Sequence, residues 1–200
     1  MILAVGDLAA AADELAVRHG LAAVEGGRHP GWGTANRIVP LGETYLELIA
    51  VVDPDEAAAS EFGRWVASTS SAGETTRLLG WAVRTHDLDG VARRLGLAIG
   101  TGSRAAPDGS QLRWRSAGIE QAHVEPSLPF FLEWDPASTH PGRSAPAQPA
   151  TIARVGVRGD PARLARWLGD HALALEVEPG PPELARVVLA TPHGDVVLGL

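Results

Sequence analysis

The chain is most informative at Gly26-Gly27-Arg28-His29-Pro30-Gly31-Trp32-Gly33-Thr34-Ala35-Asn36-Arg37, which is soon followed by Tyr45-Leu46-Glu47-Leu48-Ile49-Ala50. Glycine tolerates positive φ and proline fixes its own φ, so residues 26–33 are predicted to form a turn-rich loop. The β-branched and apolar residues that follow predict one strand at residues 34–39 and a second at 45–51. A turn around Gly42 would join the two strands as a hairpin.

Two polar residues interrupt these apolar strands. Side chains alternate across a strand, so Glu47 shares one face with Tyr45 and Ile49. A carboxylate among apolar neighbours is costly unless it is paired, binds a metal or faces a wet cavity. Asn36, the only asparagine of the chain, also lies in a predicted strand, where asparagine is disfavoured. Two such exceptions in adjacent strands predict a functional site.

The same residues carry a family resemblance. GGRHPGWGTAN at 26–36, with YLELIA at 45–50, resembles the glyoxalase-like domain of the vicinal oxygen chelate superfamily, and LPFFLEW at 128–134 is similar to the matching strand of that domain's second half. The resemblance covers residues 1–135. It implies an α+β fold in which paired βαβββ modules form a curled mixed sheet around a cavity. Members isomerise, dioxygenate, add thiols or only bind ligands, so the resemblance implies a fold and not a reaction.

Strand-to-helix junctions recur along the chain. Gly6-Asp7-Leu8, His86-Asp87-Leu88 and Gly159-Asp160-Pro161 lie 80 and 73 residues apart, and each Asp is predicted to cap a helix. We expect a first βαβββ module at residues 1–68, a second at 76–135, a Pro-, Ser- and Ala-rich linker at 136–150, and an extra C-terminal α/β partial module, βαβ-like, at 151–200. Within them we predict one helix from residue 54 to 67, a strand at 81–85 and a glycine-rich loop at 100–103.

Bulk composition excludes several classes of protein. A net charge of −7 without a basic cluster argues against a nucleic-acid partner, because phosphate neutralisation needs a cationic surface. No apolar run approaches about 18 residues and no signal peptide is present, so neither a membrane span nor export is expected. The chain has no Cys, which fits a cytoplasmic location and excludes thiol chemistry. All 17 basic residues are Arg, so a Schiff-base lysine is excluded too.

The resemblance also implies a divalent metal held by the first and last strands of each module. The last-strand positions match Glu47 and Glu133, which align as Tyr-Leu-Glu-Leu and Phe-Leu-Glu-Trp and suit a weakly held hard cation such as Mg or Mn. The first-strand positions depart from the family pattern: one falls at or just before Met1, where relatives usually show His, and the other falls on Gly80. For each glutamate the alternative is an ion pair with an arginine.

Other candidates lie around this pair. His29 is a candidate base or hydrogen-bonding group near neutral pH, and the alternative is an exposed loop histidine. Asn36 can hold a substrate carbonyl or orient Glu47, or it can bond backbone. Five further residues are predicted to bind substrate, although strand packing or a solvated face would also explain them; these are Trp32, Thr34, Tyr45, Arg113 and Phe131.

Three functions fit these observations. The first is a glyoxalase-like lyase or isomerase acting next to a carbonyl in a cavity between the modules, with Glu47 as base or ligand and with Asn36 and His29 assisting. The second is a non-catalytic protein that binds or sequesters a small molecule on the same fold. The third is an assembly module whose C-terminal third completes the sheet or pairs two chains as a homodimer. A buried glutamate favours the first, because an apolar binding site has no need of a desolvated carboxylate.

Overall fold

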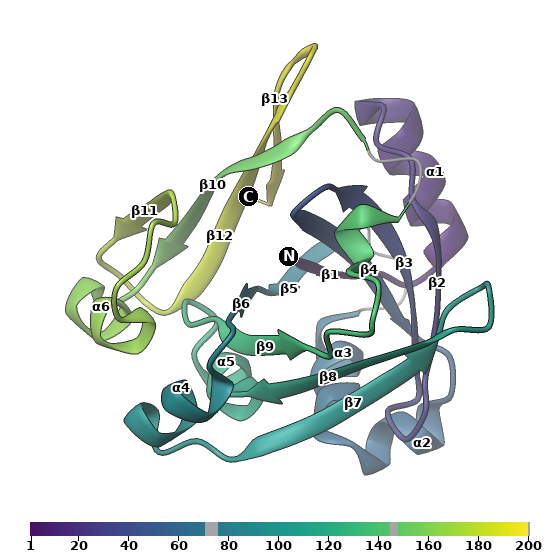
Figure 1. Ribbon diagram of the computed structural model, residues 1–200. Helices are drawn as coiled ribbons and strands as arrows, with labels where there is room; N and C mark the ends of the chain where they lie inside the picture. The colour runs from purple at the N-terminus through teal and green to yellow at the C-terminus, as the bar shows by residue number, and fades with distance from the viewer. Residues whose placement is uncertain (71–75, 145–147, 200) are drawn as a thin grey trace.

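A computed structural model describes residues 1–70, 76–144 and 148–199 (Figure 1). The described residues form three mixed sheets with six α-helices and one short 3-10 helix. Mixed α+β architecture built on βαβββ modules is therefore confirmed. Among these helices none is both long and apolar enough to cross a bilayer. Of the linker expected at 136–150, residues 145–147 lie outside the described ranges.

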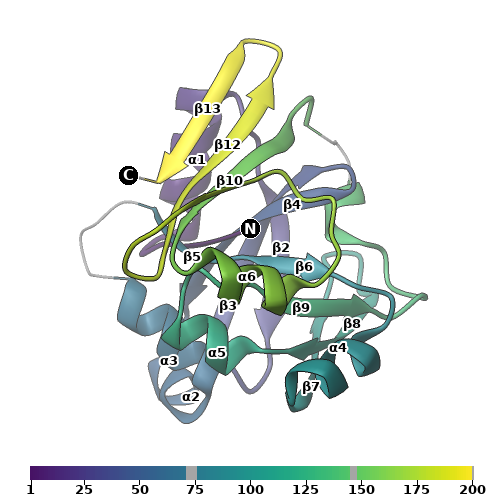
Figure 2. The ribbon, with the colours of Figure 1, turned by 90° about the vertical axis from the view of Figure 1, so that its left-hand side faces the viewer.

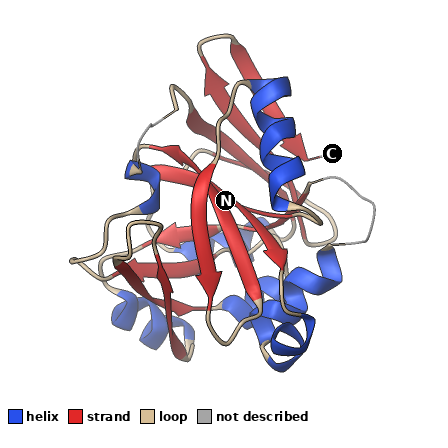
Figure 3. Cartoon of the chain, turned by 90° about the vertical axis from the view of Figure 1, so that its right-hand side faces the viewer, coloured by secondary structure: helices blue, strands red, loops and turns tan. Residues whose placement is uncertain are grey.

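The first sheet has the strand order β2-β3-β4-β1-β5, in which β1 runs parallel to β4 and antiparallel to β5. Its curved strands, with the helix α1 beside them, are seen in Figure 3. The elements of this part of the chain are β1 (Ile2–Ala4), α1 (Leu8–His19), β2 (Val24–His29), β3 (Thr34–Leu41), β4 (Thr44–Val51), α2 (Pro54–Ala59), α3 (Glu61–Thr69) and β5 (Arg77–Gly80).

The second sheet repeats this arrangement with the order β6-β9-β8-β7, and again the first strand of the unit, β6, runs parallel to the last, β9. Its elements are β6 (Ala82–Arg84), α4 (Leu88–Leu95), β7 (Ile99–Ala105), β8 (Gln111–Ala117), α5 (Ile119–Val124) and β9 (Phe130–Trp134). The recurrence predicted from the spacing of the capping aspartates thus corresponds to two units of the same topology.

The third sheet has a different topology. Its order is β11-β10-β12-β13, so the first strand pairs in parallel with the second rather than with the last. After the 3-10 helix η1 (Pro141–Arg143), this part of the chain contains β10 (Thr151–Arg158), α6 (Pro161–Leu168), β11 (Leu175–Glu178), β12 (Glu183–Thr191) and β13 (Gly194–Gly199). Figure 2 shows β10, β12 and β13 standing above the second sheet, with α6 below these three strands.

The three predicted aspartate caps are present. Asp7 accepts hydrogen bonds from the amides of Ala9 and Ala10, Asp87 accepts one from Gly90, and Asp160 accepts from Ala162 and Arg163. Such side-chain acceptors satisfy amides that the first turn of a helix leaves unpaired. Gly20 and Gly96 end the first two of these helices in the left-handed conformation, which glycine adopts without a steric penalty.

The loop predicted over residues 26–33 is observed only at 30–33, where Gly31 and Gly33 adopt positive φ in a turn. Residues 26–29 belong instead to the strand β2 (Val24–His29), and there Gly26 and Gly27 serve close packing and not a turn. A Cβ on Gly26 would lie 2.0 Å from Asn36 Oδ1, and one on Gly27 would lie 2.3 Å from the carbonyl oxygen of Ala105. The second contact brings β2, the edge of the first sheet, against β7, the edge of the second.

Three smaller expectations also need correction. The single helix predicted for residues 54–67 is two helices, because Ser60 is extended and its Oγ caps α3 by accepting a hydrogen bond from the amide of Gly63. The strand predicted at 81–85 is present in shortened form as β6 (Ala82–Arg84), and Trp81 separates it from β5, which belongs to the first sheet. The glycine-rich loop predicted at 100–103 lies within the strand β7.

Each face of the first sheet packs against its own hydrophobic cluster. Leu46, Leu48 and Ala50 of β4 belong to a core shared with α1 and the third sheet. Ile49 belongs to a second core, which lies between the first two sheets and includes Trp114 and Phe130. The strand alternation predicted for β4 is therefore observed, and it directs Tyr45 and Glu47 into the space between the first two sheets.

Candidate functional site

A small chamber of about 40 Å³ lies between the first two sheets. A space of this size holds only a few water molecules or one reacting group of a larger ligand. The first sheet and its helices, the second sheet with the start of α5, and η1 all contribute to its lining, which consists of Ile2, His29, Trp32, Asn36, Ile38, Tyr45, Glu47, Phe62, Arg104, Trp114, Ile119, Phe130, Leu132, Trp134 and Pro141.

Glu47 is the carboxylate of this chamber, and its side chain is 12% exposed. Its Oε1 accepts a hydrogen bond of 2.7 Å from Asn36 Nδ2, whereas Oε2 accepts none from the described residues. Burial raises the pKa of Glu47 above its ordinary value, while the Asn36 hydrogen bond and the charge of Arg104 oppose that rise. The result is a held carboxylate with one oxygen available to a ligand.

Asn36 has its orientation set by the backbone of β2. The amide of Gly27 donates to Asn36 Oδ1 at 3.0 Å, so the Nδ2 group points into the chamber, where it lies 2.7 Å from Glu47 Oε1 and 3.3 Å from His29 Nε2. An amide nitrogen only donates, so His29 Nε2 acts as an acceptor and the ring proton sits on Nδ1, 3.0 Å from Thr34 Oγ1. One chain of hydrogen bonds thus links Thr34, His29, Asn36 and Glu47.

His29 is neutral in this arrangement. Its side chain is 4% exposed, and burial lowers its pKa to about 3, with the charge of Arg104 contributing in the same direction. The 3.9 Å approach of its Nε2 to Glu47 Oε1 is therefore not an ion pair at neutral pH. His29 lies at the end of β2 and not in a loop, and its geometry suits holding Asn36 more than accepting a proton.

Arg104 faces Glu47 from the second sheet. It is 5% exposed, and its Nη1 donates to the carbonyl oxygens of Gly26 at 2.8 Å and Ala105 at 3.3 Å. Its Nε and Nη2 donate to none of the described residues, so they are available to a ligand. A buried guanidinium with free donors is suited to a carboxylate or to a developing oxyanion. The chamber therefore pairs one carboxylate with one cation.

Aromatic rings form most of the remaining wall. Trp32 lies 5.6 Å from the His29 ring, 5.0 Å from Phe62 and 5.9 Å from Trp114, measured between centroids. Trp114 in turn lies 5.3 Å from Trp134. Large rings exclude water and lower the local dielectric, which strengthens the electrostatic contacts made inside the chamber.

Glu133 does not join Glu47. The inner face of β9 carries Phe130, Leu132 and Trp134, which line the chamber, so Glu133 points to the opposite side. There it forms an ion pair with Arg115 and accepts a hydrogen bond of 3.3 Å from the amide of Leu88 at the start of α4. Aligning the two YLEL-like segments predicts the wrong face, because pairing with the first strand of each unit places Glu47 opposite Ile2 but Phe130 opposite Ala82, three residues before Glu133.

This donor set does not fit a resident divalent metal. Among the described residues that line the chamber, Glu47 is the one carboxylate and His29 the one imidazole; His29 Nε2 already accepts from Asn36 Nδ2, and Asn36 Oδ1 already accepts from the amide of Gly27. No group of three or more His, Cys, Asp or Glu residues is found in the described part of the chain. Typical sites have three or four protein ligands, and the nearby Arg104 charge opposes a cation.

The other predicted site residues divide into two groups. Trp32 and Tyr45 line the chamber, and buried Thr34 holds the His29 ring. Arg113 lies on the outer face of β8, where its backbone contacts Ser138, and Phe131 packs 6.1 Å from the Trp167 ring in the core shared with the third sheet. Neither of these two side chains lines the chamber.

Arg104, Trp114 and Trp134 are site residues that the sequence interpretation missed. Arg104 lies near the end of β7, the second strand of its unit, as His29 lies at the end of β2. Aligning the two units strand by strand would have indicated it. The glycines at 100 and 102 obscured that signal, since they are typical of a loop; a Cβ on Gly102 would lie 2.4 Å from the Trp114 ring.

A model of the glyoxalase-like domain family matches residues 1–173 of this chain. A search of the curated proteins finds no match. Among solved structures, a hypothetical protein from Staphylococcus aureus is similar with a TM-score of 0.69 at 14% identity, covering 94% of this chain and 88% of that chain.

Two structures of methylmalonyl-CoA epimerase are similar over a shorter part. The enzyme from Mycobacterium tuberculosis has a TM-score of 0.45 at 21% identity, covering 68% of this chain and 85% of that chain. A Streptomyces coelicolor variant in complex with 2-nitronate-propionyl-CoA has a TM-score of 0.46 at 18% identity, covering 70% and 94%. Such likenesses concern the fold, and they transfer no activity to this chain.

Proposed function

Because this chain belongs to the glyoxalase-like domain family of the vicinal oxygen chelate superfamily, we propose that it is a small-molecule enzyme which removes a proton next to a carbonyl group. The reaction would be of the lyase or isomerase type. One observation carries the proposal: Glu47 is buried in a chamber with room for one reacting group, with Oε1 held by Asn36 and Oε2 free of hydrogen bonds from the described residues.

The chemistry follows from the two charged groups of the chamber. Glu47 Oε2 accepts a proton from the carbon next to the carbonyl, the electron pair of that C–H bond forms a C=C bond to the carbonyl carbon, and the π pair of the C=O bond moves onto the oxygen. The free N–H groups of Arg104 donate to the enolate oxygen that forms. If the proton returns to the opposite face of the same carbon, or to another carbon, the substrate is isomerised. If a leaving group departs from the carbon next to the deprotonated one, the reaction is an elimination of the lyase type.

The electrostatics support Glu47 as the base. A general base is most effective when its pKa approaches the working pH, and burial moves the Glu47 pKa in that direction. His29, neutral with its pKa lowered to about 3, is a poor base at neutral pH. We assign His29 and Asn36 to positioning Glu47, with Trp32 and Tyr45 as walls that exclude water.

Deuterium exchange tests this proposal without knowledge of the natural substrate. Straight-chain 2-oxo acids carry an exchangeable proton next to a carbonyl and a carboxylate that Arg104 can meet. We expect the protein to accelerate deuterium incorporation from D2O, followed by proton NMR, and Glu47→Gln to reduce that rate on the order of 100-fold or more. Glu25→Gln is the matched control, since Glu25 is exposed on the same sheet. Equal rates for both variants would remove Glu47 from any catalytic role.

Arg104→Gln tests the second half of the site. It removes the charge and leaves a hydrogen-bonding side chain, so affinity for a 2-oxo acid should fall on the order of 10-fold or more by calorimetry. Arg28→Gln, an exposed arginine on β2, should bind as the unaltered protein does. An unchanged affinity in Arg104→Gln would show that the substrate anion is recognised elsewhere.

The aromatic walls favour a second candidate, a protein that binds or sequesters a small molecule without turning it over. The exchange and binding experiments distinguish this protein from an enzyme. Binding of the 2-oxo acids with no exchange above the uncatalysed rate, and with equal affinity in Glu47→Gln, would support sequestration and contradict catalysis.

A further inference from the structure

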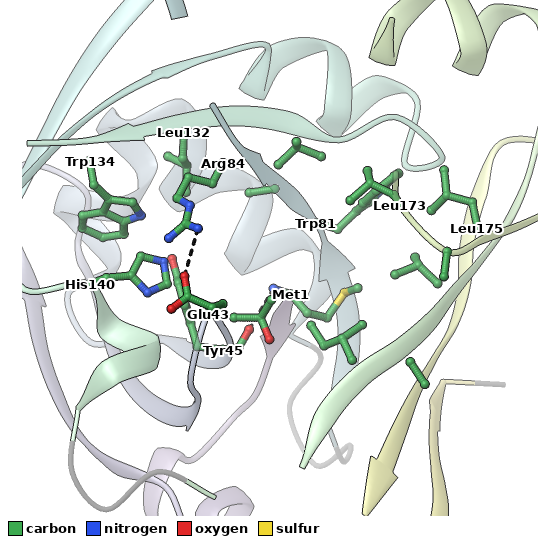
Figure 4. Close-up of a pocket in the computed structure, with 17 residues that line it drawn as sticks. Met1, Glu43, Tyr45, Trp81, Arg84, Leu132, Trp134, His140, Leu173 and Leu175 are labelled. Atoms are coloured by element: carbon green, nitrogen blue, oxygen red, sulfur yellow. Dashed lines mark hydrogen bonds and ion pairs between the residues drawn. The ribbon is translucent and has the colours of Figure 1, made fainter. Parts of the chain in front are cut away.

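A larger cavity adjoins the chamber. It has a volume of about 350 Å³, at the lower end of the usual range for small-molecule sites, and it lies where the first two sheets meet β10 and the segment leading into β11 (Figure 4). Three side chains, Tyr45, Leu132 and Trp134, line both spaces. The chamber and the cavity are therefore neighbours with a shared wall.

The walls of this cavity are mainly apolar. Residues in or next to strands of the second and third sheets supply most of that surface; these are Trp81, Val83, Ile152, Val155, Leu173 and Leu175. The indole N–H of Trp81 already donates to the carbonyl oxygen of Ser127 at 3.2 Å, so its ring offers only apolar contact. A ligand portion lodged here would be held by burial of carbon and not by hydrogen bonds.

Charge is confined to one end of the cavity. There Glu43 pairs with Arg84 at 3.1 Å and with Arg143 at 2.6 Å, as Figure 4 shows for the first pair. His140 lies beside them, with ring centroids 5.5 Å from Tyr45 and 5.9 Å from Trp134. Burial lowers the pKa of His140 to about 4, so at neutral pH it adds an uncharged ring to this wall.

The Tyr45 hydroxyl stands at the junction. It makes no hydrogen bond with the described residues, although Tyr45 faces Glu47 on one side and the cavity on the other. A polar atom of a ligand that passes from the chamber into the cavity would therefore find a hydrogen-bonding partner in this hydroxyl.

From this juxtaposition we propose that the cavity holds an apolar tail of the substrate whose carbonyl head occupies the chamber. The substrate class is then a carbonyl acid with an extended alkyl or aryl chain, and the third sheet serves as one wall of the substrate site. This inference rests on the proposed function for the identity of the head group. The chamber alone, at about 40 Å³, has no room for such a tail.

Affinity against chain length tests the tail site by calorimetry, with pyruvate, 2-oxobutyrate, 2-oxohexanoate, 2-oxooctanoate and 2-oxodecanoate as probes. Each methylene buried in an apolar site should tighten binding about fourfold until the cavity is filled. Ala153→Phe and Ala174→Phe place a ring in the cavity from two different segments and should abolish the dependence. Thr151→Phe, an exposed change on β10 outside the lining, should retain it.

The outcomes separate this proposal from the proposed function. A chain-length dependence that persists in Glu47→Gln supports the tail site even if no exchange is ever seen. Exchange without any chain-length dependence would overturn the tail site and leave the enzyme proposal standing. The tail site is also wrong if Ala174→Phe, which changes an exposed residue and should fold, retains the full dependence, or if 2-oxodecanoate does not bind at all.

Discussion

Asn36 Nδ2 donates to Glu47 Oε1 across 2.7 Å, and the two residues come from neighbouring strands that pair in register as Asn36↔Ile49 and Ile38↔Glu47. The amide cannot rotate freely, because Gly27 N–H holds its oxygen from the other side. The position of the candidate base is thus set by backbone pairing through one intermediate side chain.

Asn36→Ala should shift the pH profile of exchange. The Asn36 hydrogen bond stabilises the ionised form of Glu47, so removing it raises the pKa of Glu47 further. The acidic limb of the rate profile should move to higher pH, and the loss of positioning should lower the rate on the order of 100-fold. Carbon NMR titration of the glutamate carboxyls checks the pKa separately from activity. A profile that keeps its acidic limb would contradict the assigned role of Asn36.

Glu47→Gln should stabilise the protein at neutral pH. The folded-state pKa of Glu47 is raised, so its folded form binds more protons than the unfolded form, and stability falls as pH rises through that interval. Gln keeps the Asn36 hydrogen bond and removes the buried charge, at about 1.4 kcal/mol for each unit of the shift. Urea unfolding at neutral pH and at about pH 4 should show a gain only at the higher pH. Glu25→Gln should change the free energy of unfolding by less than about 0.5 kcal/mol.

His29→Gln should remove part of the acid sensitivity of folding. The folded pKa of His29 lies at about 3 against an ordinary value of 6.5, so between these values the unfolded chain binds the extra proton and stability falls as pH falls. The free energy of unfolding of the unaltered protein should therefore drop more steeply over this interval than that of the variant. Exposed His193 provides the control through His193→Gln. Parallel curves for all three proteins would show that His29 is charged in the folded state.

Gly26→Ala should disturb the site through packing alone. The new Cβ would meet Asn36 Oδ1 at 2.0 Å and the Asn36 carbonyl oxygen at 2.7 Å, and backbone cannot move aside without breaking the hairpin. We expect a loss of about 1–3 kcal/mol in unfolding free energy and slower exchange. Gly6→Ala meets nothing within 4 Å and should behave as the unaltered protein does. Equal stability of the two variants would mean that β2 and β3 are further apart than described.

Local signals determined much of this fold. The starts of three helices could be predicted from Asp7, Asp87 and Asp160, because a capping carboxylate accepts hydrogen bonds from amides only a few residues away. Strand alternation placed Tyr45, Glu47 and Ile49 on one face of β4, since that period depends only on the backbone. The conflict between Glu47 or Asn36 and their apolar surroundings indicated a site before any contact was known.

Tertiary structure decided which residues complete that site. Gly26 and Gly27 were interpreted as a turn because glycine permits one, but here the missing side chains let Asn36 and Ala105 approach β2. Arg104 reached Glu47 only because β7 closes against β2, a contact between residues far apart in sequence. Glu133 lies outside the site because β9 pairs three residues away from the alignment of the two segments, and an odd offset turns a strand side chain to the other face. Helix and strand propensity and the alternation of side chains along a strand depend on neighbouring residues only. The approach of one sheet edge to another depends on how the whole chain packs.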